Sequence, residues 1–114
     1  MSVYIKNIAH EKALSLADQV TIIPGQIASR TLAQNQAPSI TLFAFSKGEE
    51  ISTHQSEGDA MVTILSGTGR LTINGTAHIV KAGQTLIMPA QKPHAVYAVE
   101  DFKMMLTVVF PYQS

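Results

Sequence analysis

The chain alternates between apolar and polar side chains over most of its length after residue 25. In segments 27–32 and 40–45, successive side chains fall on two opposite faces, the period of two that a β-strand produces. Similar runs predict further strands at residues 61–65, 70–73, 78–80, 85–88, 95–99 and 103–110. Many short strands at regular spacing are typical of an antiparallel sandwich or barrel, so the pattern predicts an all-β protein.

One segment, residues 10–20, favours a helix instead. Its apolar residues recur at roughly helical spacing and are Ala13, Leu14, Leu16 and Ala17. The segment runs into the β-branched residues 20–23, and Pro24-Gly25 then predicts a turn. We therefore expect a short N-terminal helical segment before the strands begin.

The breaks between the strands carry turn residues. Asn74-Gly75 lies between two alternating runs and is the strongest short hairpin signal, because a type I′ turn needs a positive φ at both central residues. No linker, low-complexity tract or internal repeat interrupts the chain. We expect a single domain, with an N-terminal helical segment and edge strands over residues 1–38 and the barrel core over residues 39–110.

Composition narrows the classes of function. Of the 114 residues, 46% are hydrophobic and only 14% are charged, whereas soluble domains carry about 25% charged residues. This composition excludes disorder and indicates extensive burial or an oligomer interface. The 8 basic and 8 acidic residues balance to a net charge of +0, which provides no basic surface for nucleic acid or for an anionic membrane.

The chain has no cysteine, which excludes disulfide scaffolds, zinc ribbons, iron–sulfur clusters and thiol nucleophiles. Its first residues lack the long apolar core of a signal peptide. The longest apolar run, residues 104–110, is far shorter than a membrane span. We expect a cytoplasmic protein.

Two segments combine glycine, proline and histidine in a consistent register. They are residues 48–54, which end in His54, and residues 83–89, which are followed by Pro93-His94. These segments resemble the two signature motifs of the cupin superfamily, and the resemblance extends over residues 39–109. It implies an antiparallel cupin β-barrel, or jelly roll, in which members of the family commonly hold a divalent metal with three histidines and a glutamate.

Only half of that implied ligand set is present. His54 matches the first histidine of motif one and His94 matches the histidine of motif two, whereas Ser56 and Ala60 stand where the second histidine and the glutamate belong. Two imidazoles fall short of the three or four protein donors that a transition metal needs. We therefore expect Mn, Fe, Ni or Zn to bind weakly or optionally at His54 and His94. Motif two also has Gln91 for the usual glycine and Ala98 for the usual asparagine.

Strand parity bears on whether a third donor exists. On one extended strand, residues 54, 56 and 60 would share the inward face, and Glu57 and Asp59 would point away. A bulge at Gly58 would change the register and bring one of these two carboxylates inward. The sequence leaves both arrangements open.

The four histidines could also have roles that involve no metal. We expect His54 and His94 to approach each other across the barrel, as hydrogen-bonded pocket residues, an acid/base pair or ligand contacts. His78 is expected on a strand surface or interface, and His10 in solvent. The methionines that could line an apolar pocket are Met61, Met88, Met104 and Met105.

Three hypotheses of function follow. The first is a small-molecule-binding cupin whose pocket contains His54, His94 and Ser56, with a weak or optional divalent metal. The second is a metal-dependent cupin enzyme, an oxygenase or an isomerase. The third is a structural or regulatory homodimer with a vestigial pocket. For all three we expect a homodimer formed through edge strands, because exposed strand edges need protection.

Overall fold

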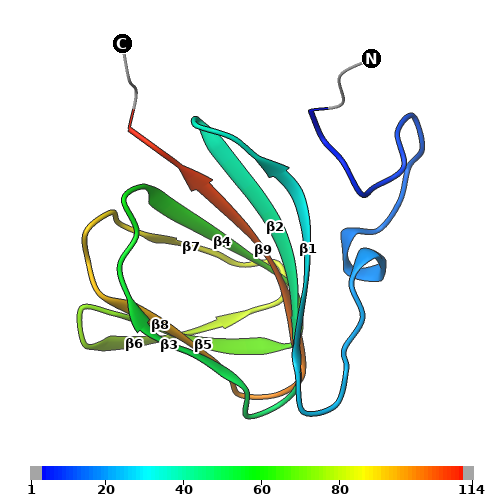
Figure 1. The fold of residues 1–114 in the computed structure, drawn as a ribbon. Helices are drawn as coiled ribbons and strands as arrows, with labels where there is room; N and C mark the ends of the chain where they lie inside the picture. Colours follow the sequence, from blue (N-terminus) through cyan, green and yellow to red (C-terminus); the bar gives the residue numbers. More distant parts are fainter. Residues whose placement is uncertain (1–3, 112–114) are drawn as a thin grey trace.

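The computed structural model describes residues 4–111, which form two antiparallel sheets packed face to face (Figure 1). The five-stranded sheet has the order β1-β2-β9-β4-β7 and consists of β1 (Ile27–Gln34), β2 (Pro38–Phe45), β9 (Phe102–Val109), β4 (Asp59–Ser66) and β7 (Thr85–Met88). The four-stranded sheet has the order β3-β8-β5-β6 and consists of β3 (Glu50–His54), β8 (His94–Ala98), β5 (Thr68–Ile73) and β6 (Thr76–Lys81). The predicted all-β antiparallel class is confirmed.

All eight strands predicted from the alternating pattern are present, and a ninth was missed. This strand is β3, whose sequence Glu-Ile-Ser-Thr-His offers a single aliphatic side chain, Ile51, to the interior. Such a short polar stretch carries too little alternation to distinguish it from a loop. It forms a strand because β8 pairs with it, as in the register partners Ile51 and Val96.

The predicted hairpin is confirmed. Ile73 of β5 pairs with Thr76 of β6, and Asn74 and Gly75 connect them with φ angles of 49° and 85°. Positive values at both positions are what a type I′ turn requires, and they match the right-handed twist of the strands on either side.

The prediction of an N-terminal helical segment over residues 10–20 was wrong, because this segment has only a single 3-10 turn, Leu16–Gln19. Glu11, with φ of 58°, takes the left-handed conformation inside the predicted helix and prevents a continuous α-helix. The segment instead runs along the outer face of the five-stranded sheet (Figure 1). There Leu16 and Val20 pack with Leu42 and Ala44, so its apolar residues serve tertiary packing without helical periodicity. Within the described chain, no helix has the length and apolar composition needed to cross a membrane.

The two sheets do not close into a barrel, so the jelly-roll form of the predicted fold is the one observed. Closure would need hydrogen bonds between an edge of one sheet, β1 or β7, and an edge of the other, β3 or β6; over residues 4–111 these strands pair only within their own sheets. The edges β3 and β7 have only five and four residues, which leaves little backbone for pairing between sheets. The architecture is therefore an open jelly-roll sandwich.

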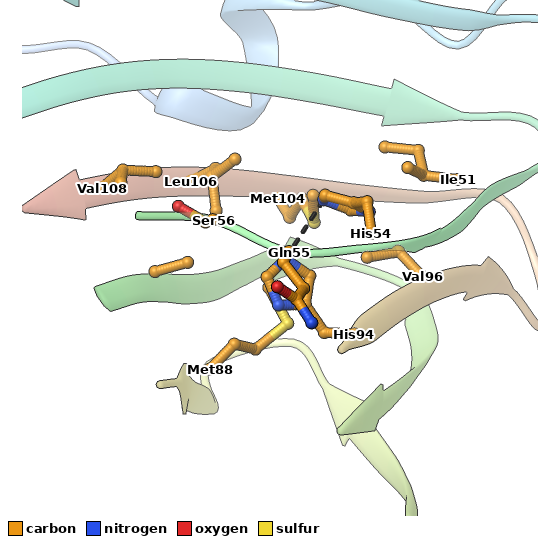
Figure 2. A pocket seen from close by; sticks show the side chains of 11 residues that line it. Ile51, His54, Gln55, Ser56, Met88, His94, Val96, Met104, Leu106 and Val108 are labelled. Atoms are coloured by element: carbon orange, nitrogen blue, oxygen red, sulfur yellow. Dashed lines mark hydrogen bonds between the residues drawn. The ribbon is translucent and has the colours of Figure 1, made fainter. Parts of the chain in front are cut away.

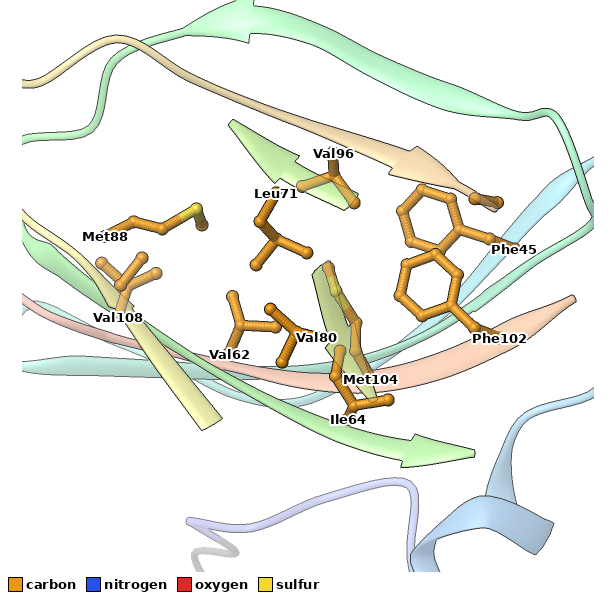
Figure 3. Packing of buried hydrophobic residues seen from close by; sticks show 12 residues of the cluster. Phe45, Val62, Ile64, Leu71, Val80, Met88, Val96, Phe102, Met104 and Val108 are labelled. Carbon is orange, nitrogen blue, oxygen red and sulfur yellow. The ribbon is translucent and has the colours of Figure 1, made fainter. Parts of the chain in front are cut away.

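Side chains from both sheets form the main core, and they fill it unevenly (Figure 3). At one end the Phe45 and Phe102 rings stack with their centroids 4.6 Å apart and their planes 19° from parallel. At the other end lie Met88 and Val108. The interior there is lined by smaller or more flexible side chains, including Ala60. The candidate site is found at this second end.

The passage from β3 to β4 determines which side chains enter that end. The two strands are separated by a loop, residues 55–58, so residues 54–60 are not one extended strand as the sequence suggested. Gly58 lies in this loop against β9, where an added Cβ would stand 2.5 Å from the Val109 carbonyl oxygen. From Asp59 to Ile64 β4 pairs in regular register with β9, as in Ala60 with Val108. No bulge at Gly58 therefore alters the register.

Candidate functional site

The structure brings His54 and His94 together although 40 residues separate them in the chain (Figure 2). They are register partners at the ends of β3 and β8 that lie beside each other. Their Nε2 atoms are 3.1 Å apart, and their rings meet edge to face with centroids 4.3 Å apart and planes at 78°. The prediction that the two imidazoles approach each other is confirmed, but they meet on adjacent strands of one sheet and not across the barrel.

The hydrogen bonds of the pair assign a proton to each ring. His54 Nδ1 lies 2.9 Å from the carbonyl oxygen of Ser52. Because a carbonyl only accepts, Nδ1 carries the proton and donates, which leaves neutral His54 with a lone pair on Nε2. His94 must then donate from its own Nε2–H to that lone pair across the 3.1 Å contact. The pair therefore has one donor and one acceptor, in a fixed order.

The two histidines differ in their surroundings. His54 is exposed, whereas only 2% of His94 is accessible, and His94 Nδ1 has no hydrogen-bond partner within the described chain. Burial lowers the pKa of His94 below its ordinary value of 6.5, and the adjacent His54 lowers it further by charge repulsion. The main chain of Lys92 has a smaller, opposing effect on this pKa. His94 is therefore held in its neutral form.

A cavity of about 270 Å³ opens beside the pair, at the end of the sandwich away from the stacked phenylalanines. Its walls are mostly aliphatic or thioether side chains, and its polar side chains are the two histidines, Gln55 and Ser56 (Figure 2). The residues that line it are Ile51, His54, Gln55, Ser56, Ala60, Met88, His94, Val96, Met104, Leu106 and Val108. None of these carries a carboxylate or an aliphatic amine.

Two of the four methionines expected near a pocket do line it, Met88 and Met104. Met61 is 38% exposed on the outer face of β4, and Met105 packs in the second cluster below the N-terminal segment. The even-numbered residues of β9 that line the cavity follow the period of two, so this signal was present in the sequence. The Ser52 carbonyl was not anticipated, since a main-chain contact has no residue signature.

Glu57 and Asp59 do not replace the missing ligands. Asp59 is exposed, and its Oδ1 accepts a hydrogen bond of 2.8 Å from the main-chain N–H of Ala90. Glu57 is exposed in the loop before β4. The regular pairing of β4 directs Ala60 inward and its neighbour Asp59 outward, so neither carboxylate lines the cavity.

The donor set does not fit a tightly held metal ion. The cavity offers two imidazole nitrogens, and over residues 4–111 no three His, Cys, Asp or Glu side chains gather closely enough to hold an ion together. The Ser56 hydroxyl accepts a hydrogen bond of 3.2 Å from Gly58 N–H, and the place of the glutamate is taken by the methyl group of Ala60. Three or four protein donors are usual for transition metals.

A main-chain hydrogen bond next to the site connects the loop that follows β3 with the loop that precedes β8. Gln91 N–H donates a hydrogen bond of 2.9 Å to the carbonyl oxygen of Ser56, which links the loop before β8 to the loop after β3. Gln91 has φ of 69°, the left-handed conformation that favours glycine. Gln91, which stands where the resemblance implies a glycine, therefore has a backbone conformation that glycine adopts more easily.

The remaining histidines lie away from the cavity. His10 is exposed, as predicted, with its Nε2 2.7 Å from the Ile5 carbonyl oxygen. His78 is half-buried on β6, opposite Leu71 of β5, and does not line the cavity.

Replacing Gln91 with glycine should stabilise the protein. A non-glycine residue in the left-handed region destabilises the folded state by about 1–2 kcal/mol, and glycine removes this strain. Glycine also makes the unfolded chain more flexible, which offsets the gain in stability by about 0.5–1 kcal/mol. We expect Gln91→Gly to raise the free energy of unfolding in urea by about 0.5–1 kcal/mol. Gln91→Ala, which removes the same side chain and keeps the strain, should bring no such gain; an equal gain would show that the backbone conformation is not responsible.

The imidazole of His94 should titrate below pH 6.5. The unfolded chain then binds this proton more readily than the folded chain, so the stability that His94 contributes is lost as the pH falls below 6.5. The measurement is an NMR titration of the histidine side-chain nitrogens, with urea unfolding at several pH values alongside. A His94 pKa at or above 6.5 would contradict the buried, neutral assignment.

Known proteins resemble this chain in sequence and in fold. A family model described as "Cupin domain" matches residues 41–110. A conserved protein of unknown function from Streptococcus pyogenes is 52% identical in sequence, with 98% of each chain covered and a TM-score of 0.96. A cupin superfamily protein from Desulfitobacterium hafniense is 30% identical, with 96% of this chain and 100% of that chain covered and a TM-score of 0.91.

A third solved structure, a cupin 2 conserved barrel domain protein from Leptotrichia buccalis, is 39% identical, with a TM-score of 0.82 over 84% of this chain and 47% of that one. No curated protein matches the sequence. The match to the family model spans more than half of the chain, and both motif histidines lie within it. This chain belongs to the cupin superfamily.

Proposed function

We propose that this protein binds a small, largely apolar molecule in the cavity between its two sheets, with His54, His94 and Ser56 as polar contacts. The observation that carries the proposal is a cavity of about 270 Å³ with apolar walls and a histidine pair at its side. Ligand sites commonly combine such walls with a few converging polar groups. A dry cavity of about 150 Å³ already accepts benzene, so the space suffices for a compound of moderate size.

The charge of the lining supports a neutral ligand. No carboxylate, amine or guanidinium group is among the described residues that line the cavity, and His94 is held neutral. A permanently charged ligand would lose its hydration without gaining an ion pair, which is unfavourable in an apolar site.

A divalent ion is an optional part of this proposal. The Nε2 atoms of His54 and His94 are the two donors that could hold Mn, Fe, Ni or Zn. His94 would first have to give up the Nε2 proton that it donates to His54, and water would have to complete the coordination. The unfilled interior supports a binding role over a vestigial pocket, and the lack of a third donor weighs against a metal-dependent oxygenase or isomerase. The homodimer and the cytoplasmic location stay predictions.

An apolar probe should bind in the cavity. Toluene and isobutylbenzene, added to protein labelled with ¹³C at the methionine methyl groups, should shift the Met88 and Met104 signals saturably and leave Met61 unchanged. Ala60→Leu should weaken this binding at least about tenfold because the larger side chain fills the space. Ala77→Leu, on the exposed face of β6, is the matched control. Shifts at Met61 alone, or none at any methionine, would refute the binding role.

Metal binding should be weak and should depend on both histidines. Protein purified without chelator and analysed by mass spectrometry should hold well below one equivalent of metal per chain, and titration with Mn, Fe, Ni and Zn should show weak binding. His54→Ala and His94→Ala should each abolish this binding, whereas His10→Ala should retain it. One equivalent held through desalting would reveal a third donor and would favour the metal-dependent enzyme.

A further inference from the structure

We infer that the ligand of this cavity is a neutral apolar molecule with a hydroxyl group, such as a phenol or an alcohol, which inserts between His54 Nε2 and His94 Nε2. This inference rests on the proposed function and names the class of ligand. The observation behind it is the fixed order of donor and acceptor in the histidine pair.

The order follows from the hydrogen bonds of the two rings. The Ser52 carbonyl holds the His54 proton on Nδ1 at 2.9 Å, so His54 presents an acceptor at Nε2, and His94 presents Nε2–H at 3.1 Å from it. A group that replaces this direct contact must accept from His94 and donate to His54. A hydroxyl does both through one oxygen atom.

The positions of the two histidines allow the direct contact between their rings to open. His94 lies on β8 with 2% exposure, enclosed by the core, whereas His54 is exposed on the last residue of β3. The pairing of β3 with β8 is irregular between Ile51 and His54, so the backbone around His54 is less constrained than that around His94. A hydroxyl would enter by displacing the exposed ring, and the buried donor would stay in place.

Other ligand classes fit this pair less well. A carboxylate would accept from His94 Nε2–H but would face the lone pair of His54 Nε2. An ether or ketone would leave His54 Nε2 without a donor if it replaced the direct contact. A cation would find no carboxylate among the described residues that line the cavity. Opening the direct contact breaks one hydrogen bond of the pair and a hydroxyl forms two with it, whereas an ether, a ketone or a carboxylate forms only one.

The test compares toluene with three of its para-substituted derivatives at pH 8, above the lowered pKa of His94. The probes are 4-methylphenol, 4-methylanisole, toluene and 4-methylbenzoate, and their dissociation constants come from the Met88 and Met104 methyl shifts. One net hydrogen bond corresponds to about a fivefold change in affinity. We expect 4-methylphenol to bind at least about fivefold more tightly than each of the other three.

Variants locate the effect at the pair. His54→Phe keeps an aromatic ring and removes the acceptor, so it should abolish the preference for 4-methylphenol over toluene while toluene still binds. His54→Leu serves the same purpose if the phenylalanine variant folds poorly. His10→Phe, which changes an exposed histidine outside the cavity, should keep the preference.

The outcomes separate the two proposals. Equal affinity for 4-methylphenol, 4-methylanisole and toluene would overturn the hydroxyl inference and leave the apolar binding site intact. Tightest binding of 4-methylbenzoate would replace the hydroxyl class with an anionic one. A hydroxyl preference that persists in His54→Phe would show that the pair is not its source. Binding of none of the probes would refute the proposed function itself.

Discussion

The space between the two sheets is packed tightly at one end only, and the candidate site depends on this unevenness. Phe45 and Phe102, paired on adjacent strands, stack at 4.6 Å and fill one end with aromatic rings. At the other end the inward positions include Ala60, whose methyl group leaves room between β4 and the histidines. Since protein interiors are normally packed as densely as organic crystals, a cavity of about 270 Å³ is a specific feature of that end.

The histidine pair adds polarity to this space at the end of the sandwich where His54 is exposed. His94 is held by a buried strand, and His54 by a short edge strand whose only inward aliphatic side chain is Ile51. The Ser52 carbonyl orients the exposed ring and thereby determines the proton order of the pair. A main-chain group thus controls the chemistry that two side chains present to the cavity.

The N-terminal segment reduces the number of positions that are open to charged side chains. It covers part of the outer face of the five-stranded sheet, where Val20 packs with Leu32, Leu42 and Ala44 in a second apolar cluster. The Lys103 ammonium group donates a hydrogen bond of 2.6 Å to the Ala17 carbonyl oxygen and links this segment to β9. The sheet is therefore apolar on both faces over part of its area, so fewer positions are left for charged side chains.

The sequence alone was sufficient for the features that rest on local pattern. Alternation predicted eight strands, Asn74-Gly75 predicted its turn, and the glycine and histidine spacing identified the cupin family and the approach of His54 and His94. The strands, the turn and the motif spacing depend on backbone preferences or on a register of a few residues, which neighbouring residues determine. The approach of His54 and His94, which are 40 residues apart, was expected only through the resemblance to the family.

Tertiary structure decided the rest, because it depends on partners far along the chain. The helical spacing of residues 10–20 became a single 3-10 turn since the sheet beneath offered an apolar surface to extended chain. β3 exists through its pairing with β8, and pairing with β9 directs Ala60 inward and Asp59 outward. The open sandwich, the cavity and the order of protons in the histidine pair arise in the same way, from contacts between residues that no local pattern connects.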